Sequence, residues 1–179
     1  MNLPNKLTVL RVILIIPFVF FMLMTEYGDW QKWVALVIFC AASITDMLDG
    51  YIARRDHLVT NFGKFMDPLA DKLLVCSAMI CLVSLRMLPT TVCIIIIARE
   101  FAISGFRLVA ADNGIVIAAG IWGKLKTISQ MFMVIVLIAD LGGVFDKVGT
   151  ILVIVATALT LISLIDYIWK NRQVLSMQD

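Results

Sequence analysis

Six stretches without Asp, Glu, Lys or Arg dominate this chain of 179 residues. A helix needs about 20 residues to cross the hydrocarbon core of a bilayer. Most of the stretches reach that length only by including charged residues at their flanks. We therefore expect six membrane-crossing helices with their polar residues mostly toward one end. The stretches are 12–25, 33–45, 73–85, 87–98, 127–139 and 148–165, and the included charges are Arg11, Asp46, Asp71, Lys72, Arg99, Glu100 and Lys126.

Composition favours a lipid environment over water. The chain is 61% hydrophobic and 16% charged, whereas soluble domains average about 45–50% apolar and about 25% charged residues. Its mean hydropathy is +0.99. A soluble helical bundle would need a polar outer face, and six such stretches leave too few polar residues for one. We expect an all-α integral membrane protein with a short N-terminal interfacial segment, forming a single domain over 1–179.

The distribution of basic residues predicts the orientation. With six spans, 12 of the 15 basic residues fall on the side that holds both termini, and Lys32, Arg86 and Lys147 fall on the other. Basic residues concentrate on the cytoplasmic side of membrane proteins. We therefore expect a multi-pass protein of the cytoplasmic membrane with both termini in the cytoplasm. The 12 residues are Lys6, Arg11, Arg54, Arg55, Lys64, Lys72, Arg99, Arg107, Lys124, Lys126, Lys170 and Arg172.

The four cysteines do not suggest a redox or zinc site. All lie within apolar stretches, and no two have the CxxC spacing. We expect packed thiols at Cys40, Cys76, Cys81 and Cys93.

An aspartate-rich segment separates the second and third apolar stretches. On helices, Asp46 and Asp49 lie about 60° apart, and Asp67 and Asp71 lie one turn apart. Carboxylates at membrane depth are costly and usually mark function. Four of them in proximity raise one another's pKa unless cations neutralise them. Oxygen ligands suit Mg²⁺, Mn²⁺ or Ca²⁺, so we expect the four aspartates to share two such ions.

Small and phosphate-contacting residues accompany the aspartates. Small residues let a ligand approach the backbone, and basic or hydroxyl side chains contact phosphate oxygens. Together with a metal pair, these features are typical of a phosphoryl-transfer site. The small residues are Gly50, Ala53 and Gly63, and the phosphate-contacting candidates are Arg54, Thr60 and Lys64.

Each feature has a simpler structural interpretation. Asp67, which precedes Pro68, could be only a helix N-cap. The basic residues could be only topological anchors, and the small residues could only permit close helix packing. For any single residue, the structural interpretation is about as good as the phosphoryl-transfer interpretation. For the whole set together, the structural interpretation is poor.

The set has a specific spacing, Asp46-x2-Asp49-Gly50-x2-Ala53-Arg54-x8-Gly63-x3-Asp67-x3-Asp71. This pattern resembles the signature of the CDP-alcohol phosphatidyltransferases, without departure. The segments LPNKLTVLR near the start, AREFAISGFR at 98–107 and GKLKT at 123–127 are similar to the bacterial phosphatidylglycerophosphate synthase branch. The resemblance extends along nearly the whole chain.

The resemblance implies a fold and a reaction. It implies a six-helix membrane protein, usually homodimeric, with a polar cavity open to the cytoplasm. The implied reaction transfers a phosphatidyl group from CDP-diacylglycerol to sn-glycerol 3-phosphate and releases CMP. No nucleic-acid partner is expected.

The resemblance also implies roles for individual residues. Asp46 and Asp67 would bridge two Mg²⁺ or Mn²⁺ ions, Asp49 would complete the first site and Asp71 the second. Asp71 would also accept the proton of the attacking hydroxyl. The residues implied in binding CDP-diacylglycerol are Asn5, Thr8, Gly50, Ala53, Arg54, Thr60 and Gly63.

The acceptor is a dianion and needs a basic pocket to offset the aspartates. Arg107, Lys124 and Lys126 are the candidates for binding its phosphate. Arg99 and Glu100 either line this pocket or form a buried structural ion pair. We expect such pairing to involve other helices, on the reasoning that consecutive helical residues cannot face each other.

Two rival functions stay open. One is the same chemistry with another alcohol, such as inositol phosphate or serine, against which AREFAISGFR and GKLKT argue by resemblance. The other is a small transporter that binds cations through intramembrane aspartates. Release of CMP distinguishes the enzyme from the transporter.

Overall fold

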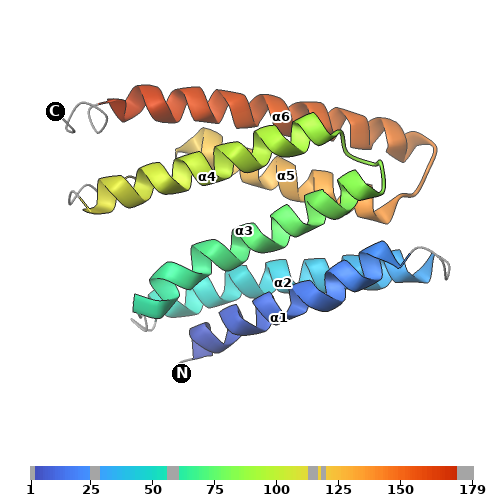
Figure 1. Ribbon diagram of the computed structural model, residues 1–179, viewed down its shortest axis with the longest axis horizontal. Helices are drawn as coiled ribbons and strands as arrows, with labels where there is room; N and C mark the ends of the chain where they lie inside the picture. Colours follow the sequence, from blue (N-terminus) through green and yellow to red (C-terminus); the bar gives the residue numbers. More distant parts are fainter. Residues whose placement is uncertain (1–2, 25–28, 56–60, 113–116, 118–119, 173–179) are drawn as a thin grey trace. The chain divides into compact units, whose positions relative to one another are not determined.

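A computed structural model describes residues 3–24, 29–55, 61–112, 117 and 120–172, with side chains for 6–24, 29–45, 69–111, 117 and 120–172. Regular structure in this part of the chain consists entirely of α-helices (Figure 1). They are α1 (Leu3–Leu23), α2 (Trp30–Arg55), α3 (Asn61–Ser84), α4 (Thr90–Asp112), α5 (Ile121–Ala139) and α6 (Val144–Lys170).

The helices extend past the apolar stretches into charged flanks, as the sequence predicted. Arg11 lies in α1, Asp46 in α2, Asp71 in α3, Glu100 in α4 and Lys126 in α5. The N-terminal segment, in contrast, is not an element of its own. Helix α1 begins at Leu3 and continues through Pro17 to Leu23. Whether its first turns lie along the membrane interface stays a prediction.

Three of the described helices are long and apolar enough to cross a membrane by themselves: Lys6–Leu23, Ile121–Ala139 and Val144–Lys170. A shorter apolar segment, Trp30–Thr45, lies in α2. Helices α2, α3 and α4 each combine an apolar part with a charged part. The fold is therefore that of an all-α membrane protein, and the number of six spans stays a prediction.

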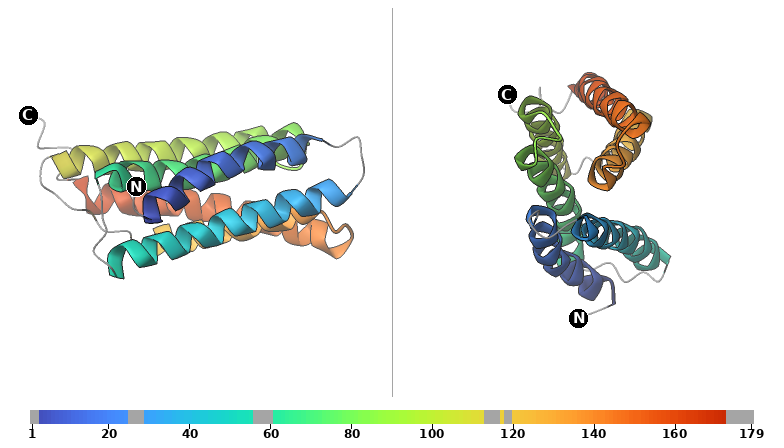
Figure 2. Two further views of the ribbon diagram at one scale, coloured as in Figure 1. Left: turned by 90° about the horizontal axis from the view of Figure 1, so that it is seen from below. Right: turned by 90° about the vertical axis from the view of Figure 1, so that its right-hand side faces the viewer.

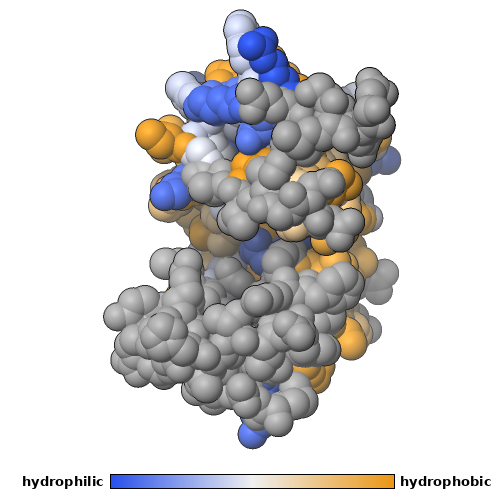
Figure 3. Space-filling model, turned by 90° about the vertical axis from the view of Figure 1, so that its left-hand side faces the viewer, coloured by the Kyte–Doolittle hydropathy of each residue, from blue (hydrophilic) through white to orange (hydrophobic). Residues whose placement is uncertain are grey.

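Large apolar side chains cover the outside of the helices. Ile16, Val37, Ile121, Val144 and Trp169 are each more than 60% exposed, and Figure 3 shows apolar residues along the flanks of the described surface. Water would be a poor solvent for such a surface. A bilayer would cover it.

By their contacts, the helices divide into two compact units. The first unit comprises Met1–Met87 with Leu137–Asp140, and the second comprises Leu88–Val136 with Leu141–Asp179. In the first unit, α1 packs along both α2 and α3, which contact each other much less (Figure 2). The rings of Phe18 in α1 and Phe39 in α2 lie with centroids 5.8 Å apart.

The face that α1 buries in the first unit changes character along the helix. Thr8, Arg11, Ile15, Phe18 and Met22 are all buried and follow the spacing of three and four residues that places side chains on one helix face. The stripe is polar in the first turns of α1 and apolar in the rest. Among the described side chains of α1, the two buried polar residues, Thr8 and Arg11, therefore lie in the half of the helix nearer its start.

In the second unit, α4 packs against α6. The buried residues of α6 are Gly149, Ala156, Thr160, Ser163 and Tyr167. Most of these are small, which lets helix backbones approach closely in a membrane protein. Near the end of α6, the ring of Tyr167 meets that of Phe106 edge to face, with centroids 5.6 Å apart.

The cysteines agree with the prediction of packed thiols. All four are free. Cys76, Cys81 and Cys93 are buried, and Cys40 is half-buried.

Candidate functional site

The four aspartates lie where α2 ends and α3 begins. Asp46 and Asp49 are in the last three turns of α2, and Asp67 and Asp71 are in the first three turns of α3. From Arg55 to Asn61 the chain makes six Cα–Cα steps and can reach at most about 22 Å, which limits the distance between the two helix ends. Asp71 is half-buried. The side chains of the other three aspartates lie outside the described part of the structure.

The predicted donor-binding residues that the structure describes lie on helices that meet at the same end of the first unit. Figure 1 shows the start of α1, the end of α2 and the start of α3 at this end. Thr8 of α1 is fully buried there. Asn5, Gly50, Ala53, Arg54 and Gly63 lie on these helix ends with side chains outside the described part, and Thr60 lies outside the described residues altogether.

Arg11 is a site candidate that sequence reasoning used only as a topological marker. It is 1% exposed and lies one turn after Thr8 on the buried face of α1. A buried arginine is strongly destabilising unless anionic groups compensate its charge. The four aspartates of α2 and α3 could supply such groups, and so could an anionic substrate. The helical spacing from Thr8 was the signal in the sequence that could have found it.

The four carboxylates at the end of α2 and the start of α3 are suitable ligands for a divalent cation. Four carboxylates supply only oxygen ligands, which Mg²⁺ and Mn²⁺ prefer. They come from two helix ends joined by a short connection, so they can converge. Among the residues with described side chains, no group of three metal-ligating residues occurs, and three of the four aspartates are not among those residues.

A second charged cluster links α4 and α5 in the second unit. Glu100 Oε1 accepts hydrogen bonds from Arg99 Nη1, at 3.1 Å, and from Lys126 Nζ. The side chains of Arg99, Glu100 and Lys126 are 10%, 18% and 2% exposed. Glu100 therefore pairs with another helix, as one of the two interpretations predicted.

The expectation that consecutive residues cannot pair was wrong. Arg99 and Glu100 are neighbours on α4 and still form a 3.1 Å ion pair. The Arg side chain is long and flexible enough to reach a carboxylate that starts about 100° around the helix.

The three candidates for binding the acceptor phosphate differ in their surroundings. Arg107 and Lys124 are exposed, whereas Lys126 is buried in the ion-paired cluster. The guanidinium carbon of Arg107 lies 5.6 Å from the ring centroid of Tyr167, a cation–π distance. Figure 3 looks onto the end of the second unit where α6 ends, and strongly hydrophilic residues gather there.

The match to known proteins agrees with this arrangement. A sequence profile described as CDP-alcohol phosphatidyltransferase matches residues 1–162. The match spans the aspartate end and the ion-paired cluster alike.

The chain belongs to the CDP-alcohol phosphatidyltransferase family.

Individual members of this family are similar to the chain over most of its length. A protein of Bacillus subtilis is 50% identical over 143 residues, covering 74% of each chain, and one of Rickettsia typhi is 41% identical over 166 residues, covering 90% of this chain and 92% of its own. Both are named CDP-diacylglycerol--glycerol-3-phosphate 3-phosphatidyltransferase. A Mycobacterium tuberculosis protein, named probable phosphatidylglycerophosphate synthase, is 37% identical over 172 residues, covering 93% of this chain and 80% of its own.

Proposed function

We propose that this protein transfers the phosphatidyl group of CDP-diacylglycerol to sn-glycerol 3-phosphate, giving phosphatidylglycerophosphate and CMP. One observation carries the proposal: the complete aspartate signature lies on the two adjoining helix ends of a chain that belongs to this family. The names of relatives that are 37–50% identical support the choice of acceptor. Family membership disfavours the transporter alternative.

The reaction requires one proton transfer and one displacement. The acceptor's primary hydroxyl oxygen forms a bond to the phosphorus that carries diacylglycerol. The bond from that phosphorus to the bridging oxygen breaks, and CMP leaves with the electron pair. Asp71, half-buried on α3, accepts the hydroxyl proton, because a primary alcohol is a weak nucleophile without a positioned base.

Two divalent ions, Mg²⁺ or Mn²⁺, fit this proposal. Asp46 and Asp67 would hold both ions, Asp49 would complete the first site and Asp71 the second. When bound, the ions neutralise diphosphate oxygens and stabilise the charge on the leaving group. The protein contributes a fixed carboxylate set at two helix ends, close to the interface where a lipid and a soluble substrate can meet.

The donor is bound by the starts of α1 and α3 and by the end of α2. Thr8 and Arg11 are buried on the face of α1 that packs against both of these helices. Arg11 adds a positive charge that favours the diphosphate and offsets the aspartates. The other donor contacts are those implied by the family signature, from Asn5 to Gly63.

Arg107 and Lys124 bind the phosphate of the acceptor, because they are exposed cations that can exchange water for a soluble dianion. Lys126 supports them indirectly: its ammonium is buried against Glu100, which also holds Arg99. The active site and both termini face the cytoplasm, where glycerol 3-phosphate is available, and the protein acts as a homodimer in the cytoplasmic membrane.

Product identification tests the acceptor directly. Purified protein is incubated with CDP-diacylglycerol and, in separate reactions, glycerol 3-phosphate, inositol phosphate, serine or glycerol. We expect a new phospholipid only with glycerol 3-phosphate, identified by its mass. A lipid product formed preferentially from another alcohol would contradict the assigned acceptor and leave the phosphatidyl transfer intact.

A further inference from the structure

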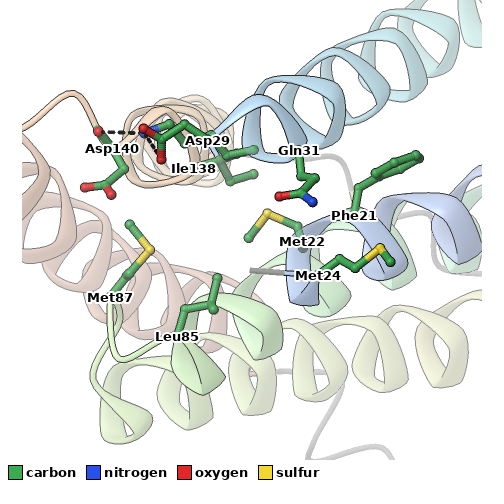
Figure 4. Close-up of a pocket in the computed structure, with 10 residues that line it drawn as sticks. Phe21, Met22, Met24, Asp29, Gln31, Leu85, Met87, Ile138 and Asp140 are labelled. Atoms are coloured by element: carbon green, nitrogen blue, oxygen red, sulfur yellow. Dashed lines mark hydrogen bonds and ion pairs between the residues drawn. The ribbon is translucent and has the colours of Figure 1, made fainter. Parts of the chain in front are cut away.

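A cavity of about 380 Å³ lies in the first unit at the end opposite the aspartates (Figure 4). Its walls are the end of α1, the first turn of α2 and the residues that follow α3 and α5. From Gln31 to Asp46 along α2 there are 15 residues, or about 22 Å of helix. The cavity is therefore separate from the proposed catalytic site.

Gln31 supplies an unused hydrogen-bond acceptor to this cavity. The residue is 3% exposed, and its Oε1 atom is buried without a hydrogen-bond partner in the described structure. In Figure 4 its amide points into the space beside Met22. A buried acceptor without a partner destabilises the fold, because it has lost its hydrogen bonds to water. A ligand that carries N–H or O–H groups would remove this cost.

The charges around the cavity favour a cation. Two carboxylates, Asp29 and Asp140, and one ammonium, Lys32, line it. Lys32 Nζ already contacts Asp29 Oδ1 at 3.5 Å and the Asp140 carbonyl oxygen at 3.3 Å. Among the described lining residues, negative charges therefore exceed positive charges by one.

Helix ends add to this negative potential. The C-terminal ends of α1, α3 and α5 border the cavity, against one N-terminal end, that of α2. The last carbonyl groups of a helix carry a partial negative charge, and the first N–H groups carry a partial positive charge. Three ends against one again favour a bound cation.

Aromatic residues place the cavity at the depth of lipid headgroups. Trp30 and Trp33, in the first turns of α2, are 56% and 45% exposed. The Trp30 ring packs against Phe21, a lining residue, with centroids 5.9 Å apart. Exposed tryptophans of membrane proteins concentrate at the level of the headgroups. A phospholipid headgroup is therefore the ligand that this location supplies at highest concentration.

We propose that this cavity binds the headgroup of a zwitterionic phospholipid with a primary ammonium, of the phosphatidylethanolamine class. The ammonium donates a hydrogen bond to Gln31 Oε1 and neutralises the excess negative charge. Lys32 has three N–H donors, of which two are directed to Asp29 and Asp140, and the third binds the lipid phosphate. Met22, Met24 and Phe21 contact the ethylene carbons. The site goes beyond the proposed transferase reaction and lies on the other side of the membrane from it.

Matched lipids test the ammonium specificity. The full-length protein in detergent is titrated with dioleoyl-phosphatidylethanolamine, dioleoyl-phosphatidylcholine or dioleoyl-phosphatidylglycerol, and bound lipid is counted by native mass spectrometry. Phosphatidylcholine keeps the positive charge but has no N–H donor, and phosphatidylglycerol has hydroxyl donors but no cation. We expect phosphatidylethanolamine to bind about tenfold more tightly than either, as the loss of one charge-assisted hydrogen bond implies.

A substitution assigns the binding to this cavity. Gln31→Met keeps the size of the side chain and removes the acceptor, so we expect phosphatidylethanolamine binding to fall about tenfold. Without added lipid, the folded variant should be as stable as the wild type or more stable, because it no longer buries a polar atom without a partner. Val37→Ala, on an exposed position of the same helix, serves as the control and should bind normally.

Three results would overturn the proposal. The first is equal binding of the three lipids, which would make the cavity a water-filled cleft. The second is tighter binding of phosphatidylglycerol, which would contradict the charge argument. The third is equally tight binding of soluble phosphoethanolamine, which would contradict a membrane lipid as the source.

Discussion

The proposed chemistry depends on four aspartates at the adjoining ends of α2 and α3. We expect Asp71→Asn to reduce transfer by about 10²–10⁴-fold, the range typical for loss of a positioned proton-transfer group. Asp46→Asn and Asp67→Asn should also nearly abolish transfer, because each removes a proposed ligand of both metal ions. Asn has the shape of Asp but lacks its charge, so insertion and folding should persist. Initial rates of CMP release measure the effect, with Asp146→Asn in the first turn of α6 as the control. Rates near wild type for any of the three variants would contradict the shared metal site.

Arg107 and Lys124 should affect the acceptor much more than the donor. A charge-assisted contact to phosphate contributes about 1.5–3 kcal/mol, so Arg107→Ala or Lys124→Ala should raise the KM for glycerol 3-phosphate by roughly ten- to a hundredfold. The KM for CDP-diacylglycerol should change little. Steady-state kinetics with each substrate varied in turn provide the measurement.

The exposed residue Lys147 offers a matched control for these variants, since Lys147→Ala removes a positive charge from the first turn of α6. Equal changes in both KM values, or none, would assign Arg107 and Lys124 to a structural or topological role. The choice of acceptor would then depend on the similarity to named relatives alone.

The sequence was sufficient to predict which residues form the site, but not how buried each residue is or what it contacts. The spacing of Asp46, Asp49, Asp67 and Asp71 was enough to place them on adjoining helix ends. It could not show that Lys126 is buried against Glu100 while Lys124 is exposed, because which face α5 turns toward α4 depends on packing between helices. The buried acceptor of Gln31 was hidden for the same reason.

At the scale of helices, the cluster of Arg99, Glu100 and Lys126 should hold α4 and α5 together. Removing one partner of a buried ion pair leaves an uncompensated charge and costs about 3–5 kcal/mol. We expect the destabilisation by Lys126→Met to lie near the lower limit of this range, because Arg99 still pairs with Glu100. Thermal unfolding in detergent measures the loss of stability.

A double-mutant cycle separates this pairing from the packing of each side chain. The combination of Lys126→Met with Glu100→Gln should be less destabilising than the sum of the single variants by about 1 kcal/mol or more. Additive losses would mean that the two side chains do not stabilise each other. Lys126 would then again be a candidate for direct contact with the acceptor.

Phe18 tests the packing of α1 in the first unit. Its side chain is fully buried and meets Phe39, whereas Phe20 on the same helix is 54% exposed. Phe18→Ala leaves a cavity and should cost about 3–5 kcal/mol of folding free energy. Phe20→Ala removes the same atoms from a surface that lipid or detergent covers, so its unfolding temperature should stay close to wild type. Equal losses in the two variants would contradict the described orientation of α1.

The helices themselves were accessible from the sequence for a simple reason. An uncharged stretch too short to span a bilayer must extend into its charged flanks, and α1 to α5 do so through Arg11, Asp46, Asp71, Glu100 and Lys126. The start of α1 was less accessible. The segment around Pro4 and Asn5 was expected to lie along the interface, with these two residues as possible helix-start residues. Proline is well tolerated in the first turn of a helix, and α1 begins at Leu3 and runs on without a separate segment.

For the molecule as a whole, metal dependence is the main expected property. Activity should vanish after treatment with a chelator and return on addition of Mg²⁺ or Mn²⁺, because the proposed ligands are all carboxylates. Zn²⁺, which favours nitrogen and sulfur ligands, should restore less. Full activity in a thoroughly metal-stripped sample would contradict the two-ion proposal.

The most direct test of the proposed reaction follows both products in one experiment. The purified protein is supplied with CDP-diacylglycerol and glycerol 3-phosphate labelled in its phosphate group. We predict that the label enters the lipid fraction in a 1:1 ratio to the CMP released, as the displacement described above requires. Release of CMP without label in the lipid, or no release of CMP at all, would contradict phosphatidyl transfer to this acceptor.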